Sequence, residues 1–300
     1  MTLSNKKPTL RGSISLLEQY TNDSWASHWG IQGGTLDNEQ ALLELPFKEI
    51  QLNHPSGVVH GGVLATAMHD AGLLLACKAY GIKPLQIELL DQQISYIGGT
   101  RDQRITISAI FSRKARRFAF LHAEIKDEQN RMIANSQLCF RIKDDTNYEL
   151  PETCLYQAPS PLKLSPDHNY PMADERFGIN LKERSGIEIT HLSENLTQLR
   201  MPLEERYRDF RGQISNGVIL HLTDTAGVLG PLVAVPEATS GATVDFKMSF
   251  CEPTFDEPLL ATSSCINQSS GIMFSKIEVH GEQSGRLKAF GTQTFLVDCY

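Results

Sequence analysis

An internal repeat constrains the fold of this chain more than any other feature of its sequence. Gly62-Val63-Leu64, with Ala71-Gly72 further on, returns 155 positions later (217 minus 62) as Gly217-Val218-Ile219, with Ala226-Gly227 further on. Later matches are Ser95-Tyr96 with Ser249-Phe250, Asp102 with Asp256, Phe120 with Phe274, Glu124 with Glu278, Ala134 with Ala289 and Phe140 with Phe295. This period is too long for a solenoid, and it predicts two copies of a whole small domain.

The composition is that of a soluble globular protein. The chain has 300 residues, enough for two domains with a core each, and 41% of them are hydrophobic while 21% are charged. The formal net charge of −7 argues against a general role on nucleic acids or membrane surfaces, because surfaces that follow phosphates are basic. No apolar run of the signal-peptide type opens the chain, and none is long enough to span a membrane.

The six cysteines are scattered, with no CxxC spacing and no pair at matching positions of the two copies. Disulfide frameworks and zinc sites both need tighter patterns than this. We therefore expect reduced cysteines in a cytoplasmic protein and no bound metal.

Each copy follows one plan of an extended segment, a polar loop, a long helix and three or four strands. The expected helices run from about His60 to Tyr80 and from about Asn216 to Leu229, where Gly230-Pro231 ends the second. We expect extended segments and strands at 41–52, 105–111, 118–126, 132–142, 186–203, 259–266, 272–280 and 287–297. Prolines interrupt the stretch between the copies, which predicts a first domain at 1–143, a linker at 144–171 and a second domain at 172–300.

One long helix followed by antiparallel strands resembles the hotdog fold, in which a sheet wraps around a central helix. The resemblance covers both copies and implies an α+β class with two hotdog domains in one chain. Hotdog domains pair side by side into one continuous sheet, with their active sites at the seam. The two copies are therefore expected to pair as an intramolecular pseudo-dimer, as in double-hotdog enzymes.

The loop before the first helix carries the most specific motif, which runs from His54 through Gly57 to His60-Gly61-Gly62. It resembles the phenylacetyl-CoA thioesterase-like branch of the hotdog superfamily, whose signature is a polar residue, a glycine and then HGG at the helix start. The resemblance implies that the Gly61 amide polarises a thioester carbonyl. The first amides of a helix lack intrahelical acceptors, and glycine lets a substrate approach the backbone closely. A tight loop that merely caps the helix is the simpler interpretation.

The same resemblance implies an acidic residue seven positions after the second glycine. Seven residues at 100° each return a side chain to within about 20° of the glycine's face. In the second copy this position holds Asp224, whereas in the first it holds His69, with Asp70 turned about 100° away. Asp224 could instead pair with His221 on its own helix. His69 and Asp70 are compatible with a general base, a core histidine or a pair at the domain seam.

In the family, each site takes its glycine from one domain and its carboxylate from the other. One seam of this chain would combine His54, His60 and Gly61 with Asp224, so every required group is present. There, Asp224 would activate a water as general base or attack directly, with a histidine positioning the water or the carbonyl.

The second seam departs from the family pattern. Its loop reads Ser215-Asn216-Gly217 where the other reads HGG, so Asn216 carries a side chain where the thioester approaches. Asp209 stands in place of the neutral polar residue or histidine and would repel a developing oxyanion. This loop faces His69 and Asp70. We therefore predict one complete site and one degenerate site.

A basic cluster suggests where coenzyme A, as part of the substrate, would bind. Its members, in the turn between two strands, are Arg113, Lys114, Arg116 and Arg117. In the family, positive residues near this turn contact the coenzyme, and arginine suits phosphate geometrically. The uncharged counterpart at 267–271 and the position at a hairpin end also fit a solvated turn.

Three functions stay open, of which acyl-CoA thioesterase without a separate cofactor is the first. A hotdog hydratase or dehydratase pairs a histidine with an acid, as His69 and Asp209 could, but the proline-rich loop of those families is absent. A non-catalytic acyl-CoA-binding protein is the third. Paired hotdog units often associate further, so a homodimer with four hotdog domains is also expected.

Overall fold

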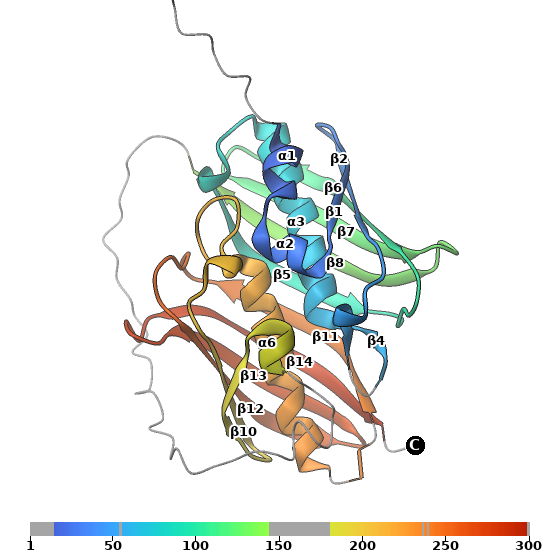
Figure 1. Cartoon of the computed structure of the whole chain (residues 1–300), viewed down its shortest axis with the longest axis vertical. Helices are drawn as coiled ribbons and strands as arrows, with labels where there is room; N and C mark the ends of the chain where they lie inside the picture. The colour runs from blue at the N-terminus through green and yellow to red at the C-terminus, as the bar shows by residue number, and fades with distance from the viewer. Residues whose placement is uncertain (1–14, 54–55, 144–180, 236, 239, 299–300) are drawn as a thin grey trace, which may run out of the picture.

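The computed structural model describes residues 15–53, 56–143, 181–235, 237–238 and 240–298, and its two halves lie one above the other in Figure 1. The predicted linker, 144–171, lies outside the described residues. The helices are α1 (Leu16–Thr21), α2 (Ser24–Trp29), α3 (Gly61–Tyr80), α5 (Leu181–Ser185) and α6 (Asn216–Ala234), with short 3-10 turns at Glu49–Gln51, Pro84–Gln86 and Glu205–Tyr207.

One antiparallel sheet of 12 strands runs through both halves in the order β1-β2-β6-β7-β8-β5-β11-β14-β13-β12-β10-β9. The strands of the first half are β1 (Gln32–Leu36), β2 (Gln40–Leu45), β5 (Ile87–Tyr96), β6 (Ile105–Lys114), β7 (Phe118–Asp127) and β8 (Met132–Ile142). Those of the second half are β9 (Glu188–Leu192), β10 (Leu196–Met201), β11 (Ser240–Phe250), β12 (Leu259–Ser269), β13 (Ile272–Gly281) and β14 (Leu287–Asp298). A separate ribbon pairs β3 (Leu52–Asn53) with β4 (Val58–Val59).

The two halves join where β5 pairs with β11 in the middle of the sheet. The paired residues run from Ser95 opposite Asp245 to Asp91 opposite Ser249, and the Ser249 hydroxyl donates to the Asp91 carboxylate at 2.9 Å. Because the ladder continues across this joint, the predicted hotdog pseudo-dimer within one chain is confirmed.

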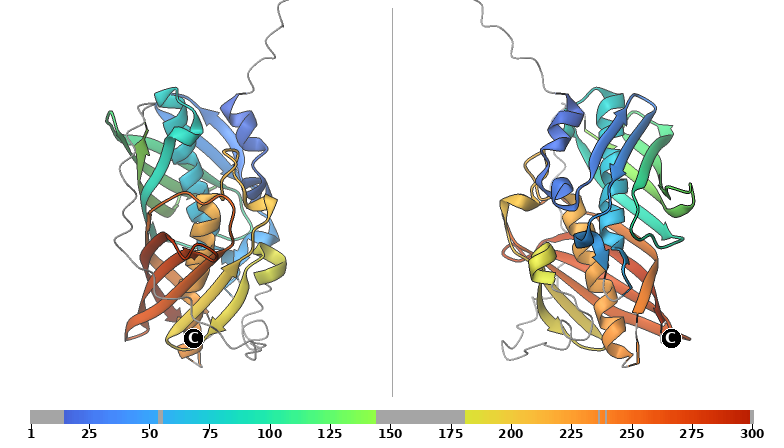
Figure 2. Two further views of the ribbon diagram at one scale, coloured as in Figure 1. Left: turned by 90° about the vertical axis from the view of Figure 1, so that its left-hand side faces the viewer. Right: turned by 45° about the vertical axis from the view of Figure 1, so that its right-hand side comes forward.

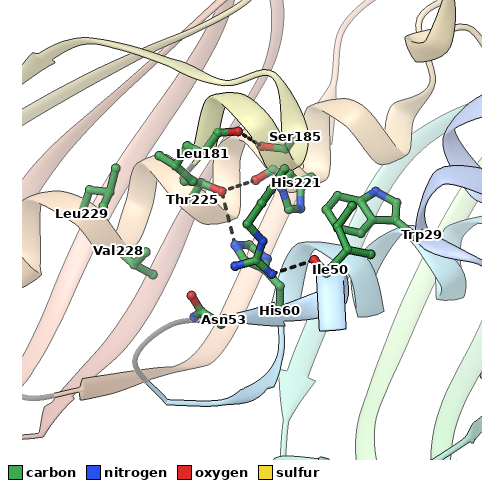
Figure 3. A pocket seen from close by; sticks show the side chains of 11 residues that line it. Trp29, Ile50, Asn53, His60, Leu181, Ser185, His221, Thr225, Val228 and Leu229 are labelled. Carbon is green, nitrogen blue, oxygen red and sulfur yellow. Dashed lines mark hydrogen bonds between the residues drawn. The ribbon is translucent and has the colours of Figure 1, made fainter. Parts of the chain in front are cut away.

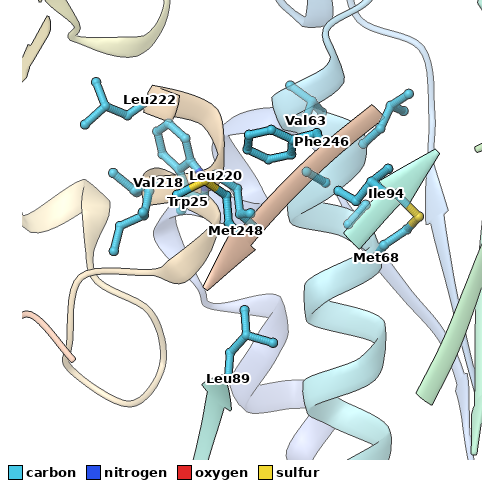
Figure 4. Packing of buried hydrophobic residues seen from close by; sticks show 14 of the residues in the cluster. Trp25, Val63, Met68, Leu89, Ile94, Val218, Leu220, Leu222, Phe246 and Met248 are labelled. Carbon is cyan, nitrogen blue, oxygen red and sulfur yellow. The ribbon is translucent and has the colours of Figure 1, made fainter. Parts of the chain in front are cut away.

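The helices that the structure describes lie on one side of the sheet, and the hydrophobic core fills the space between the sheet and the two central helices (Figures 1 and 2). Along each strand alternate residues point to this face, which is why apolar and polar residues alternate in the sequence. Phe246 and Met248 on β11 pack with helical residues such as Val63 and Leu220 across the joint (Figure 4). The core is therefore continuous between the halves.

Glycines set the distance between the two central helices, which run antiparallel and cross near their N-termini. A Cβ atom on Gly62 of α3 would lie 2.6 Å from the Cα of His221 on α6. At the repeat-related point, a Cβ atom on Gly217 would lie 2.5 Å from the Cγ2 of Thr66. Gly62 therefore lets the two backbones touch, and Gly217 lets the backbone of α6 touch the Thr66 side chain.

The second central helix is longer than predicted, because Gly230-Pro231 does not end it. Pro231 has no N–H, which leaves the carbonyl of Gly227 without its usual helical donor. The Ser275 hydroxyl of β13 donates to that carbonyl at 3.1 Å, so α6 continues to Ala234. The expectation that no run reaches the length of a membrane span is also corrected. Among the described residues α6 is the one helix long and apolar enough for this, and 89% of its apolar window is buried in the protein.

The extended segments were only partly predicted. In place of a strand over 41–52, the chain forms β2, then a 3-10 turn at Glu49–Gln51 and the short β3. The segment 186–203 is a hairpin of β9 and β10. The strands β5 and β11, which join the halves, and the helices α1 and α2 were not individually located from the sequence.

The short helices α1 and α2 cover the central helices with large aromatic side chains. Tyr20, Trp25 and Trp29 are each 1% exposed, and Trp25 lies 5.7 Å from His221 between ring centroids. Asp23 caps α2 by accepting hydrogen bonds from the amides of Trp25 and Ala26. This cover shields the helix crossing from solvent on the side away from the sheet.

The helix crossing predicts a specific sensitivity to substitution. In Gly62→Ala the new methyl group meets backbone, which cannot rotate away, so overpacking should outweigh the gain in helix propensity and lower the free energy of unfolding by about 2 kcal/mol. Gly72→Ala is the matched control in the same helix, because its Cβ would lie 3.2 Å from the edge of the movable Phe140 ring. Urea denaturation of both variants measures the difference, and equal stabilities would contradict the tight crossing.

Candidate active site

The seam that combines His60 and Gly61 with Asp224, here called the complete seam, brings the start of α3 against the middle of α6. His60 is the N-cap of α3, and its Nδ1 accepts the Gly62 amide at 2.9 Å. The Gly61 amide points out of the first helical turn and bonds to none of the residues that the structure describes. A Cβ atom on Gly61 would lie 2.8 Å from Asp224 Oδ2, so the carboxylate of one half touches the first helical glycine of the other.

Asp224 is held by two strands of its own half. The Thr243 hydroxyl of β11 donates to its Oδ1 at 3.0 Å, and the Gln293 amide of β14 donates to the same oxygen at 2.9 Å. Gln293 also donates to Thr243 at 2.8 Å, which fixes the direction of every bond in the group. Oδ1 is therefore occupied, and Oδ2 is the oxygen that faces His60 and Gly61.

This pattern corrects one alternative from the sequence, in which Asp224 pairs with His221. His221 is 2% exposed, and its Nδ1 has no hydrogen-bond partner among the described residues. The neighbouring ring is His60, with 4.4 Å between the two centroids. Asp224 is satisfied from the sheet, so its position on α6 does not depend on His221.

Hydrogen-bond directions assign the proton on His60. The Thr225 hydroxyl donates to the His221 carbonyl at 2.8 Å, so at 3.4 Å from His60 Nε2 it can only accept, and Nε2 carries a proton. Nδ1 then accepts from Gly62, and the same nitrogen lies 3.2 Å from Asp224 Oδ2. Without a further proton between these two groups, a lone pair on His60 Nδ1 would face a lone pair on Asp224 Oδ2.

Burial governs the acidity of both groups. It raises the pKa of Asp224, while His60, Thr243, the Gly62 amide and Gln293 act in the opposite direction. Burial lowers the pKa of His60, although the Asp224 charge opposes this. The two groups titrate as a pair, and the neutral forms are favoured in the closed site.

Tyr96 fixes the other side of the glycine turn. Its hydroxyl, on the seam strand β5, donates to the Gly61 carbonyl at 2.9 Å. With the carbonyl held on one side and the His60 cap on the other, the first peptide of α3 has one orientation. The Gly61 amide belongs to the preceding peptide, whose His60 carbonyl accepts the Val63 and Leu64 amides at 3.0 and 3.3 Å. It is therefore also aimed in advance, as a donor that stabilises a developing oxyanion must be.

The second seam contains a chain of hydrogen bonds that links Asn216, His69, Asp70 and Tyr20. Asn216 Nδ2 lies 3.3 Å from His69 Nε2, and His69 Nδ1 lies 2.8 Å from Asp70 Oδ1. The Tyr20 hydroxyl donates to the other oxygen of Asp70 at 2.9 Å. Asn216 therefore occupies the space between the helix start and His69, and Asp70 points toward α1 rather than the helix start.

The predicted repulsion by Asp209 is wrong, because its charge is compensated. Arg211 approaches the Asp209 carboxylate with Nε at 2.8 Å and Nη2 at 2.7 Å, and both side chains are buried. Arg211 also donates to the Ile87 carbonyl at 3.1 Å. The loop before α6 is thus a neutral ion-paired structure.

The repeat shows what the second seam lacks. The strands of the two copies are related by sequence offsets of 154 and 155. By these offsets Thr243 corresponds to Leu89 and Gln293, which also holds Asp224, corresponds to Leu138. Strand pairing supports this correspondence, because Thr243 lies opposite Phe295 and Leu89 lies opposite Phe140, the repeat-related phenylalanine. Where one seam has hydrogen-bond donors, the other has leucines, and no carboxylate could be held in the same way.

The basic cluster is not brought to the complete seam. His54 lies outside the described residues. The cluster at 113–117 is at the far end of α3, where the hydroxyl of Tyr80 donates to the Ala115 carbonyl at 2.8 Å. A helix of this length places Tyr80 about 30 Å from Gly61. Lys114 pairs with Glu39 at 3.0 Å. Binding of coenzyme A by this cluster stays a prediction.

A pocket opens beside His60, on the side of the helices away from the sheet (Figure 3). Its walls come from α2, α5, α6 and the segment before α3. The lining residues are Trp29, Ile50, Asn53, His60, Leu181, Arg184, Ser185, His221, Thr225, Val228 and Leu229. Apolar side chains and several polar groups line it together, a combination found in small-molecule sites.

Comparison with protein families finds one match, over part of the chain. Residues 56–134 match the thioesterase superfamily model, a span that includes His60-Gly61-Gly62 and the whole of α3. The match agrees with the predicted superfamily. No curated protein matches the chain by sequence.

Solved structures resemble nearly the whole chain. A TesB protein of Mycobacterium avium subspecies paratuberculosis has a TM-score of 0.64 at 10% identity, with 93% of this chain and 99% of that one covered. The acyl-CoA thioesterase II TesB2 of Mycobacterium marinum has a TM-score of 0.60 at 13% identity, covering 92% and 97%. A protein of unknown function with the hot dog fold from Alicyclobacillus acidocaldarius scores 0.59 at 15% identity, covering 92% and 98%. The class is that of hotdog-fold proteins with a thioesterase-superfamily segment.

Proposed function

We propose that this chain hydrolyses an acyl-CoA thioester at one complete site between its two halves, as an HGG-type hotdog thioesterase. The observation that carries the proposal is the contact of Asp224 from one half with Gly61 from the other. A buried carboxylate held by dedicated donors, next to an unbonded helix-start amide, provides a base or nucleophile beside an oxyanion donor. The thioesterase-superfamily match over 56–134 and the names of the similar structures support the same reaction.

The residues take the following roles in this proposal. A water molecule attacks the carbonyl carbon while Asp224 Oδ2 takes one of its protons, and the Gly61 amide stabilises the negative carbonyl oxygen. The carbon–sulfur bond then breaks, and the thiolate of coenzyme A takes the proton from Asp224. Direct attack by Asp224 would give an anhydride that water opens, and it needs the same groups. Thr243, Gln293 and His60 position Asp224.

The comparison of the two seams tests the assignment. Asp224→Asn keeps the shape but loses the base, so we expect kcat to fall about 100- to 10,000-fold, measured as thiol release from a panel of acyl-CoA esters. His69→Gln, the matched control at the repeat-related position, should keep its activity. Unchanged release in Asp224→Asn would contradict the site.

The other two functions predict different results in the same assay. Binding of acyl-CoA without any thiol release by the wild type would favour a non-catalytic binding protein. Addition of water to an enoyl-CoA would favour a hydratase, and loss of that activity in His69→Gln would place it at the second seam.

Gln293 predicts a shift in pH dependence. Activity requires the Asp224 carboxylate, so it should fall as the pH drops through the raised pKa of that group. Gln293 is one of the donors that lower this pKa, so Gln293→Leu should move the acid limb of kcat/KM to higher pH. Gln92→Leu is the control, because Gln92 is equally buried but donates to the Ala65 carbonyl. An unmoved limb in Gln293→Leu would contradict its role toward Asp224.

We also propose that two chains associate through the outer face of the sheet. Repeat-related side chains stand exposed there, with Phe120 at 39% and Phe274 at 41% exposure, close to Phe118 and Ile272 on the same strands. Adjoining apolar side chains on an open sheet face are typical of an interface. Phe120→Glu with Phe274→Glu should reduce the mass in light scattering from twice 33.4 kDa to 33.4 kDa. Leu85→Glu, an exposed leucine away from this face, should leave it unchanged.

A further inference from the structure

The pocket beside His60 contains one positive charge that the proposed hydrolysis does not use. Arg184, on α5, is half-buried and lines the pocket with His60 and Asn53. Its Nη2 donates to the Ile50 carbonyl at 2.6 Å and also contacts the Leu52 carbonyl. These two bonds anchor one edge of the guanidinium to the segment before α3.

No carboxylate among the described residues lies within ion-pair distance of Arg184. The remaining guanidinium nitrogens, Nε and Nη1, bond to none of the residues that the structure describes. Burial lowers the pKa of Arg184, and no acidic group opposes this. A half-buried arginine is ordinarily paired, because removing its charge from water is unfavourable. An unpaired guanidinium in a pocket wall is therefore suited to an anionic ligand.

We propose that Arg184 binds a carboxylate at the far end of the substrate's acyl group, so that the preferred substrates are coenzyme A thioesters of short dicarboxylic acids. This inference rests on the proposed thioester hydrolysis. Nη2 is occupied by the Ile50 and Leu52 carbonyls, so Nε and Nη1 remain as charged donors that a carboxylate can accept from. The apolar walls formed by Val228, Leu229 and Leu181 would surround the methylene groups between the two ends of the acyl chain.

The position of the pocket favours the acyl end over the coenzyme end of the substrate. His60 lines the same pocket as Arg184 and lies 3.2 Å from Asp224, so one side chain connects the pocket to the proposed reaction centre. The phosphates of coenzyme A are separated from the sulfur by the whole pantetheine arm. A carboxylate on a short acyl chain can reach Arg184 from the thioester, whereas those phosphates lie much further from the sulfur.

The test compares two substrates of equal chain length on two enzymes. The kcat/KM for glutaryl-CoA and for pentanoyl-CoA is measured on the wild type and on Arg184→Met. We expect Arg184→Met to lower kcat/KM about 10- to 100-fold for glutaryl-CoA and to leave pentanoyl-CoA nearly unchanged, because a charge-assisted hydrogen bond contributes at that level. Arg184→Lys should recover part of the loss, since it keeps the charge with fewer donors.

Lys182→Met is the matched control. It removes a positive charge from the same short helix, but this side chain is 76% exposed and pairs with Glu188 at 3.1 Å. It should leave both substrates unchanged. Thermal unfolding of each variant shows whether the bonds of Arg184 to the segment before α3 matter for stability alone.

Two results would overturn the proposal. Equal kcat/KM values for both substrates on wild type and Arg184→Met would show that Arg184 recognises no acyl carboxylate. In the second result, Arg184→Met lowers kcat/KM equally for both coenzyme A thioesters and leaves the matching N-acetylcysteamine thioesters, which lack phosphates, unaffected. That result would show that Arg184 binds a phosphate of coenzyme A instead. A wild type that releases no thiol contradicts the proposed function, and titration calorimetry with glutaryl-CoA then decides whether Arg184→Met weakens binding selectively.

Discussion

The close crossing of α3 and α6 is the constraint on which the rest of the structure depends. Gly62 touches the backbone of His221, so a larger residue there would separate the helices, and Gly217 touches the Thr66 side chain, which a larger residue would displace. At this distance the carboxylate of Asp224 reaches the first turn of the opposite helix. The same contact therefore packs the core and assembles the site, and the two cannot be altered separately.

The duplication made two seams with the same backbone and different polar groups. At one seam, Thr243 and Gln293 supply donors for a buried carboxylate, and the opposite helix starts with glycine. At the other, leucines replace the donors, and Asn216 fills the helix start and bonds to His69. A buried polar group must be satisfied wherever it lies, so losing the donors and losing the carboxylate belong together.

The sequence predicted most of the fold, because the repeat and its alternating strands carry that information locally. The hotdog pairing, the start of α3 and the contact of Gly61 with Asp224 across one seam all agree with the structure. The end of α6 was wrong, because Ser275 replaces the bond that Pro231 removes, and that donor lies on a distant strand. Thr243 and Gln293 were missed for the same reason, although their pairing with Leu89 and Leu138 in the repeat could have revealed them.

Charge is distributed unevenly around the complete seam. His60 and Asp224 lie 3.2 Å apart in a buried site, whereas Arg184 carries an uncompensated charge in the pocket next to it. Arg184 also contributes to lowering the pKa of His60, so the charge reaches the catalytic pair. An anion bound at Arg184 would remove that influence, raise the pKa of His60 and favour the charged form of Asp224. The occupant of the pocket and the readiness of the base are therefore coupled by electrostatics.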